Sequence, residues 1–269
     1  MPVRNVNNVT YHYTDQGSGQ PVILLHGFMG STLNWNTIIP ILERHNRVIA
    51  IDILGHGHSA SPADFQRYSI EETASDMAVL LEILNAKPIN LVGYSMGARI
   101  ALYFALAYPH FMNKLVLESG SPGLETQIER SSRAASDDQL ARFLLEAGIA
   151  AFVERWERLP LFASQARLPA DVQAQQKAQR LQNDPVGLAN SLRGMGTGSQ
   201  PSLWEKLNKL TISTLLIAGD LDPKYCAIAA RLAQMLPRAT LQIVPDAGHN
   251  VHLEKQKVYL QLVQNFLEG

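Results

Sequence analysis

The sequence predicts an α/β protein in which a mainly parallel sheet is flanked by helices and interrupted by a helical cap insertion. Short apolar runs alternate with longer amphipathic runs, the pattern of strands that cross over through helices. Each apolar run is nearly continuous, which is typical of strands buried on both faces. The strand signal stops between residues 120 and 203, where the chain is helical, polar and punctuated by proline and glycine.

The apolar runs define six expected strands. These are residues 21–27, 47–53, 89–95, 114–119, 213–220 and 239–246.

Helical patterns fill the gaps between these strands. Residues 69–84 have the 3.6-residue apolar period and open with Ser69 three residues before Glu72, the spacing of a capping box. A second helix is expected over residues 96–108, and the last from about Glu254 to Phe266.

The residues without strand signal predict a division of the chain. We expect residues 1–120 and 203–269 to form the core and residues 121–202 a helical cap. Ligands of open α/β sheets bind at the carboxyl ends of the strands. An insertion that follows a core strand would therefore roof the binding site.

Bulk properties exclude several classes of protein. The formal charge of -1 over 269 residues argues against a nucleic-acid partner, whose binding surface would need a strong basic excess. The single cysteine, Cys226, cannot form an internal disulfide, and we expect it to be a packing residue. The amino terminus lacks the apolar core of a signal peptide, and no run reaches the roughly 20 apolar residues of a membrane span. We expect a cytoplasmic protein that binds a small molecule and not a membrane.

Ser95 lies in the stretch "GYSMG", which has the form G-x-S-x-G between an expected strand and an expected helix. In that turn the chain reverses sharply and holds the serine hydroxyl exposed in a strained conformation, so only small flanking residues fit. Arg99 sits one helical turn later, where a cation opposes the positive end of the helix dipole. We therefore expect a negative group near Arg99.

A serine hydroxyl needs a base, and the base needs an orienting carboxylate. Asp222 and His249 follow the last two expected strands, so the chain order is serine, acid, histidine. Asp220 is the rival acid, but it directly ends its strand, whereas Asp222 precedes Pro223 at the expected loop tip. His252 is expected to be an ordinary helix-terminal residue.

Backbone amides after the first expected strand could hold an oxyanion. In "HGFMGS" at residues 26–31, we expect the Phe28 amide to act with the Met96 amide, and His26 and Gly27 to shape the loop. His56 and His58 have a metal-like spacing but lack a nearby set of carboxylates or cysteines, so a tight loop is favoured.

Five motifs spread over the chain, "HGFMGS", "GHGHS", "GYSMGAR", "GDLD" and "AGHNVH", resemble the α/β-hydrolase superfamily. Four further stretches narrow the match: "GSPGLET", "ERSSR", "WERLPLFAS" and "SLRGMGTGSQPSLW". With "GYSMGAR", they are similar to the MenH family of 2-succinyl-6-hydroxy-2,4-cyclohexadiene-1-carboxylate (SHCHC) synthases of menaquinone biosynthesis. The resemblance implies a lyase that eliminates pyruvate from a cyclohexene bearing a carboxylate, a succinyl group and an enolpyruvyl ether. No metal or organic cofactor is implied.

This substrate is polyanionic, which would explain Arg99, because arginine grips carboxylates in a bidentate manner. Residues 120–200 also hold eight of the fifteen arginines but only one of the eight lysines. The resemblance implies that the substrate contacts Tyr94, Arg99, Arg133, Trp156, Arg180 and Tyr225. Glu157 departs from the family, some members of which carry a tyrosine there.

Surface ion pairs are the alternative explanation for part of the arginine set. Arg133, Arg142 and Arg158 each have an acid four residues upstream, namely Glu129, Asp138 and Glu154. Trp35, Trp156 and Trp204 are packing residues by default.

Two other functions remain open. A carboxylesterase or C–C bond hydrolase would use the same triad with Ser95 as a nucleophile. A ligand receptor on this fold would usually have a broken triad, which is not the case here. The sequence does not define the oligomeric state.

Overall fold

The computed structural model describes residues 2–269, and one eight-stranded sheet forms its centre in the order β1-β2-β4-β3-β5-β6-β7-β8. The strands are β1 (Val3–Val6), β2 (Val9–Gly17), β3 (Gln20–Leu25), β4 (Asn46–Ile51), β5 (Ile89–Tyr94), β6 (Met112–Glu118), β7 (Ser213–Gly219) and β8 (Ala239–Val244). All pairs from β4 through β8 are parallel, as the near-continuous apolar runs predict. The predicted α/β fold with a mainly parallel sheet is confirmed.

The amino-terminal edge of the sheet was not predicted. β1 and β2 form an antiparallel hairpin, and β2 pairs antiparallel with β4, with Tyr13 opposite Ile51. The burial of β2 changes along its length, from a buried start to an exposed end at residues 15–17. Such an edge strand lacks the continuous apolar signal by which the buried strands were found.

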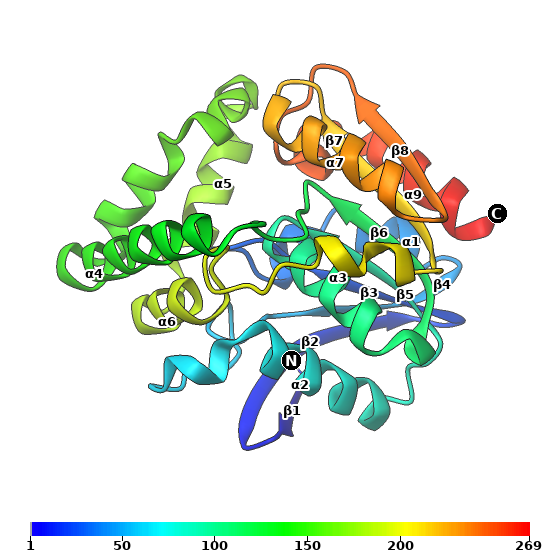
Figure 1. The fold of residues 1–269 in the computed structure, drawn as a ribbon, viewed down its shortest axis with the longest axis horizontal. Helices are drawn as coiled ribbons and strands as arrows, with labels where there is room; N and C mark the ends of the chain where they lie inside the picture. Colours follow the sequence, from blue (N-terminus) through cyan, green and yellow to red (C-terminus); the bar gives the residue numbers. More distant parts are fainter. Residues whose placement is uncertain (1) are drawn as a thin grey trace.

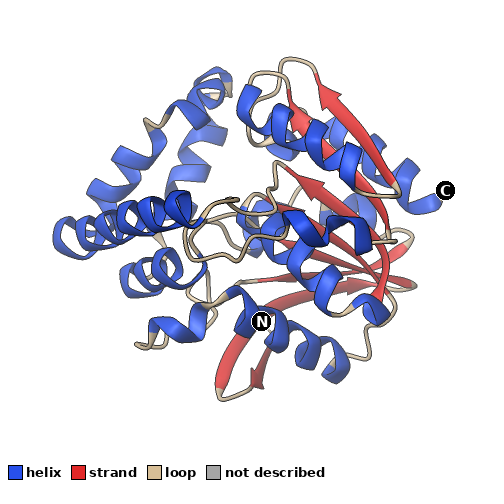
Figure 2. Ribbon diagram, viewed as in Figure 1, coloured by secondary structure: helices blue, strands red, loops and turns tan. Residues whose placement is uncertain are grey.

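Helices cover both faces of the sheet (Figures 1 and 2). They are α1 (Ile39–Leu42), α2 (Ile70–Ile83), α3 (Met96–Ala107), α7 (Pro223–Met235), α8 (Val251–Glu254) and α9 (Gln256–Glu268). Successive strand residues point to opposite faces. Ile23 and Leu25 of β3 therefore join a core cluster with α2, α3 and α7, while Val22 and Leu24 join a cluster with α1 and α9.

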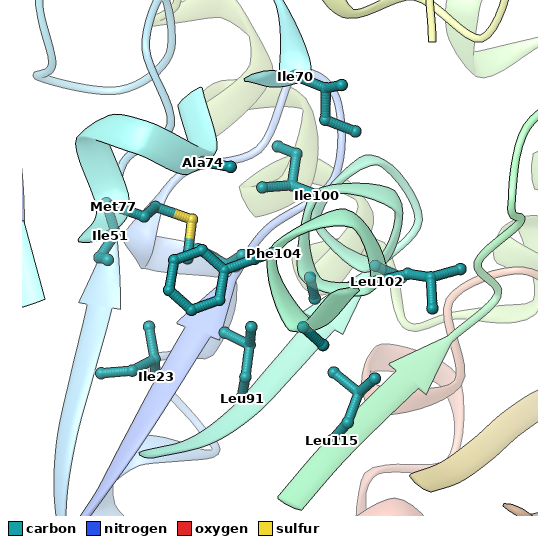
Figure 3. Close-up of a cluster of buried hydrophobic side chains, with 14 of the residues drawn as sticks. Ile23, Ile51, Ile70, Ala74, Met77, Leu91, Ile100, Leu102, Phe104 and Leu115 are labelled. Carbon is teal, nitrogen blue, oxygen red and sulfur yellow. The ribbon is translucent and has the colours of Figure 1, made fainter. Parts of the chain in front are cut away.

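Side chains of α2 and α3 interlock over the first of these faces. Figure 3 shows Met77 of α2 and Phe104 of α3 above Ile23 and Leu91 of the sheet. All four are at most 2% exposed. Burying a side chain of this size contributes roughly 1.5–3 kcal/mol, so this packing fixes α3, whose first residue follows Ser95.

Helix α2 begins at Ile70 with only half of the predicted capping box. The Ser69 hydroxyl accepts the Glu72 amide at 3.2 Å, but the Glu72 carboxylate pairs with Arg67 at 3.1 Å instead of returning a bond. A full capping box occurs at Thr126 and Glu129.

The segment between β6 and β7 is helical. It contains α4 (Gln127–Glu157), a 3₁₀ segment at Pro160–Arg167, α5 (Ala170–Leu181) and α6 (Pro185–Met195). α4 is kinked at Gly148, whose φ of 81° suits glycine because it has no Cβ. Figure 1 shows α4, α5 and α6 beyond the end of the sheet to which β6 points. Within residues 2–269, no helix has the length and apolar character needed to cross a membrane.

Candidate active site

Ser95 occupies a sharp turn between β5 and α3. Its φ of 51° is unusual for a residue with a side chain and indicates local strain. The flanking glycines permit the turn: a Cβ on Gly93 would meet the Gly97 carbonyl, and a Cβ on Gly97 would meet the Leu25 carbonyl. The strand-turn-helix predicted from "GYSMG" is therefore formed.

Ser95, His249 and Asp222 lie in hydrogen-bond contact. The Ser95 Oγ to His249 Nε2 distance is 2.9 Å, and the His249 Nδ1 to Asp222 Oδ2 distance is 2.7 Å. An ionised carboxylate can only accept, so Nδ1 carries the proton and Nε2 is free to accept the serine proton. His249 is 1% exposed and Asp222 is 6% exposed, so water does not weaken their contact.

Asp222 also caps the following helix. Its Oδ1 accepts the Tyr225 amide at 3.3 Å at the start of α7. Asp220 is exposed, and its backbone amide bonds to the Val244 carbonyl at 3.0 Å. Of the two acids considered from the sequence, Asp222 is the one that contacts His249.

Phe28 and Met96, whose amides we expect to hold an oxyanion, both line the cavity that contains Ser95. Met96 is the first residue of α3, so its N–H has no partner inside the helix. His26 holds the Phe28 loop: its Nδ1 lies 2.7 Å from the Gly27 carbonyl, and its Nε2 accepts the Ile53 amide at 3.0 Å. Burial lowers the pKa of His26, which keeps the imidazole neutral for both bonds.

The cavity around Ser95 has a volume of about 490 Å³ and is enclosed by the sheet ends and the helical segment. The residues singled out from the sequence that line it are Phe28, Tyr94, Ser95, Met96, Arg99, Arg133, Trp156, Arg180, Asp222 and Tyr225. The structure thus brings together residues from both parts of the chain. A cavity of this size suits a small organic molecule.

Arg99 is the most buried of the arginines that line this cavity, with 8% exposure. The Asp137 carboxylate lies near enough to favour the charged form of Arg99, but no carboxylate of the described residues hydrogen-bonds to it. Arg99 Nη1 donates to the Met195 carbonyl at 2.8 Å and to Gln200 Oε1 at 2.9 Å, and both acceptors are neutral. Burial lowers the pKa of Arg99 to about 10, so the guanidinium is still charged at neutral pH.

Arg133 and Arg180 also border the cavity, but each has a carboxylate partner. Arg133 pairs with Asp137 at 2.8 Å. Its upstream neighbour Glu129, considered from the sequence, instead completes the Thr126 cap. Arg180 pairs with Glu157 at 2.8 Å. Glu157, which departs from the family pattern, thus has a defined contact.

The other two predicted surface pairs differ from each other. Arg142 bonds to Asp138, as its spacing indicates. Arg158 has no ion pair with Glu154 in the described part of the chain.

Aromatic side chains form the rest of the wall near His249. The Tyr225 ring centre lies 4.5 Å from that of His249, and the Tyr94 ring centre lies 5.6 Å from it. Trp156 packs against Phe28 with ring centres 5.0 Å apart. Trp156 therefore both packs and borders the cavity.

His252 is not the ordinary helix-terminal residue that we expected. It is 3% exposed, its Nδ1 lies 2.7 Å from Glu118 Oε2, and its amide donates to Glu118 Oε1 at 3.0 Å. Trp35 stacks on the His252 ring, with the ring centres 4.5 Å apart. This buried histidine-carboxylate pair ties α8, and with it the His249 loop, to the end of β6.

The remaining residues from the sequence have structural contacts. His56 is buried with Nδ1 3.2 Å from the Leu54 carbonyl, and the His58 amide donates to Asp52 at 2.9 Å, as in a tight loop. The Cys226 thiol donates to the Gly219 carbonyl at 3.1 Å. The Arg231 guanidinium carbon lies 3.8 Å from the centre of the Trp204 ring and covers it.

Sequence reasoning missed the residues that hold the arginines in place. Gln200, Asp137 and the Met195 carbonyl contact Arg99 or Arg133. The pairing of Asp137 with Arg133 could have been predicted, since Asp137 lies four residues after Arg133 on a helix. Gln200 lies 101 residues from Arg99 in a loop, so no local spacing connects them.

Comparison with known proteins agrees with this fold. Residues 20–256 match the model of the alpha/beta hydrolase fold family. The chain belongs to the α/β-hydrolase fold family. This membership confirms the superfamily resemblance drawn from the motifs.

Within the α/β-hydrolase family, two similar proteins carry the name SHCHC synthase. A Bacillus subtilis protein, provisionally named SHCHC synthase, is 44% identical over 97% of this chain and 96% of its own length. An Escherichia coli O1:K1 SHCHC synthase is 33% identical over 87% of this chain and 88% of its own. The structure of MenH from S. aureus superposes with a TM-score of 0.91, at 34% identity, over 96% of this chain and 97% of that one.

Proposed function

We propose that this protein is an SHCHC synthase, a carbon-oxygen lyase of menaquinone biosynthesis. Its substrate would be 2-succinyl-5-enolpyruvyl-6-hydroxy-3-cyclohexene-1-carboxylate, and its products SHCHC and pyruvate. The names of the relatives support this activity over that of a carboxylesterase or C–C hydrolase.

The observation that carries the proposal is the position of Arg99 in the wall of the cavity that holds Ser95. A buried guanidinium without a carboxylate partner costs free energy, and an anionic ligand would recover it. A hydrolase of neutral esters has no use for such a group. A substrate with several carboxylates does.

In the proposed mechanism, Ser95, His249 and Asp222 act together as a base. Ser95 Oγ takes the proton from the carbon next to the succinyl ketone while its own proton passes to His249 Nε2. Asp222 orients the imidazole and stabilises the imidazolium that forms. The electron pair of the broken C–H bond forms an enolate.

The enolate oxygen would be held by the amides of Phe28 and Met96, two residues that line the same cavity. The enolate electrons then move through the ring and break the carbon-oxygen bond to the enolpyruvyl group. This group leaves as the enolate of pyruvate, and its methylene carbon takes up a proton that the His249 imidazolium gives back, which yields pyruvate and returns the triad to its starting state. No acyl group is transferred, so no covalent intermediate on Ser95 is needed.

We propose that residues 121–202 form a cap that supplies half of the residues expected to contact the substrate. Arg133, Trp156 and Arg180 come from this segment, whereas Tyr94, Arg99 and Tyr225 come from the core. Closing an anion between arginines from both parts would position it against Ser95 and exclude water.

Turnover of the enolpyruvyl substrate tests the proposal. The purified protein is mixed with this substrate, freshly made by the enzyme of the preceding step, while pyruvate and the cyclohexadiene absorbance are followed. We expect both products to appear in equal amounts. Burst kinetics on aryl esters, with no pyruvate from the enolpyruvyl substrate, would contradict the lyase and favour the esterase.

A further inference from the structure

We propose that Gln200 is a positioning residue that holds the Arg99 guanidinium through a neutral acceptor and so keeps its charge available to a substrate carboxylate. This inference rests on the proposed function, which it deepens by naming what makes the cavity selective for anions.

The contact between the two side chains is well defined. Arg99 Nη1 donates to Gln200 Oε1 at 2.9 Å, and Gln200 is 1% exposed. Guanidinium nitrogens are all donors, so the amide must turn its oxygen toward Arg99. Its Nε2 has no hydrogen-bond acceptor in the described part of the chain. The orientation of Gln200 is therefore determined by Arg99.

The backbone supplies the second acceptor. The Met195 carbonyl, at the end of α6, accepts from the same Nη1 at 2.8 Å. Arg99 Nε and Nη2 have no hydrogen-bond partner among residues 2–269. Arg99 is thus fixed at one nitrogen and retains the donors with which a guanidinium binds a carboxylate.

The other arginines of the cavity show what is unusual about this arrangement. Arg133 and Arg180 pair with Asp137 and Glu157, each at 2.8 Å. Only Arg99, the most buried of the three, has no carboxylate partner in the described chain. Glutamate has nearly the shape of glutamine, so a carboxylate at position 200 would reach Arg99. The neutral residue leaves Arg99 without a directly bonded carboxylate in the wall of the cavity.

The variant Gln200→Glu tests this inference directly. We expect its KM for the enolpyruvyl substrate to rise about 10- to 100-fold, because the new carboxylate competes with the substrate for Arg99. We expect kcat to change less than KM and the melting temperature to stay at or above the wild-type value. The rise in KM should shrink as the pH falls and the introduced carboxyl becomes protonated.

Two controls separate electrostatics from disturbed packing. Gln182→Glu makes the same chemical change at an exposed residue of the helical segment and should leave KM within about twofold. In an Arg99→Met background, Gln200→Glu should have no further effect on KM, since the charge with which it competes is absent. An equal rise in both backgrounds would overturn the inference, as would an unchanged KM in the single variant.

Isothermal titration calorimetry with succinate, a dicarboxylate probe, measures the affinity of Arg99 for a carboxylate without turnover. We expect weaker succinate binding in Gln200→Glu than in the wild type and in Gln182→Glu. Equal binding in the three proteins would overturn the inference even if the wild type is active. A wild type that binds succinate but releases no pyruvate would refute the proposed function and leave the role of Gln200 standing.

Discussion

The Asp222 carboxylate lies 2.7 Å from Nδ1 of His249, although the two residues are 27 positions apart. The Asp220 side chain, two residues earlier, is exposed. The Leu221 amide bonds to the Ala247 carbonyl at 2.9 Å, which joins the loops that carry the acid and the histidine. This connection directs Asp222 inward.

Replacement of each of these two acids by asparagine gives the first prediction. Asp222→Asn should lower kcat about 10³- to 10⁴-fold, because an amide can hold His249 in the wrong tautomer. Asp220→Asn should change kcat by less than about twofold, since its side chain is exposed. Steady-state kinetics of pyruvate release measure both. A large loss in Asp220→Asn alone would show that the acid is misassigned.

The central strands and the nucleophile turn were predictable because their signals are local. Apolar runs marked β3 through β8, and the glycines around Ser95 marked a turn that only small residues allow. Ser95, Asp222 and His249 follow the carboxyl ends of β5, β7 and β8, which lie at the same edge of the sheet. Fold topology then brought them into contact.

Features that depend on distant contacts were not predictable. The partners of Arg99 are Met195 at the end of α6 and Gln200 in the following loop, 96 and 101 residues away. The pairing of His252 with Glu118 spans 134 residues. The hairpin β1-β2 was not predicted because an edge strand lacks a continuous apolar run. The contacts of Arg99 and His252 are tertiary and leave no periodic trace in the sequence, whereas the hairpin is local but has too few consecutive apolar residues to be recognised.

Joint removal of the nucleophile and the base gives the second prediction. Ser95→Ala and His249→Ala should each reduce kcat by several orders of magnitude, and the double variant should be barely slower than the slower single one. The reason is that the first deletion already disables the proton relay. Circular dichroism checks that the variants fold. Rate losses that multiply in the double variant would mean that the two residues act independently.

The third prediction concerns stability in mild acid. Burial lowers the pKa of His56 from 6.5 to about 3, so the folded protein keeps this imidazole neutral where the unfolded chain protonates it. The unfolded state therefore binds more protons between about pH 3 and 6.5, and stability falls as the pH falls through this range. From pH 7 to 5 the cost from this residue is about 2 kcal/mol.

Urea unfolding of the wild type and His56→Gln at pH 7 and pH 5 measures this cost. The variant starts less stable, because the contacts of His56 are lost, but it should lose about 2 kcal/mol less than the wild type between the two pH values. Parallel losses in the two proteins would show that His56 is not held neutral.

Metal removal gives the fourth prediction. Dialysis against a chelator should leave kcat and KM unchanged, because the proposed proton transfers use only Ser95, His249 and Asp222. Loss of activity that returns on addition of zinc would point instead to His56 and His58, whose spacing resembles that of metal ligands.

The fifth prediction is that Arg99 recognises a carboxylate. Arg99→Ala should lower kcat/KM for the enolpyruvyl substrate by an amount equivalent to about 2–5 kcal/mol, as for loss of one partner of a buried charge pair. Arg99→Lys should recover only part of this, because the ammonium keeps the charge but not the planar two-point contact. If Arg99 served only to pack the start of α3, its aliphatic stem would matter more than its guanidinium. Arg99→Lys would then leave kcat/KM nearly unchanged.

A neutral ester that the same serine hydrolyses slowly separates these two roles. Its turnover does not require a carboxylate contact, so Arg99→Ala should leave it unchanged or faster. The same loss on the neutral ester and on the anionic substrate would mean that the substitution distorts the turn at Ser95, four residues away on the same helix. Selective loss on the anion, with the Ser95 turn intact, is the result that assigns the Arg99 charge to the substrate.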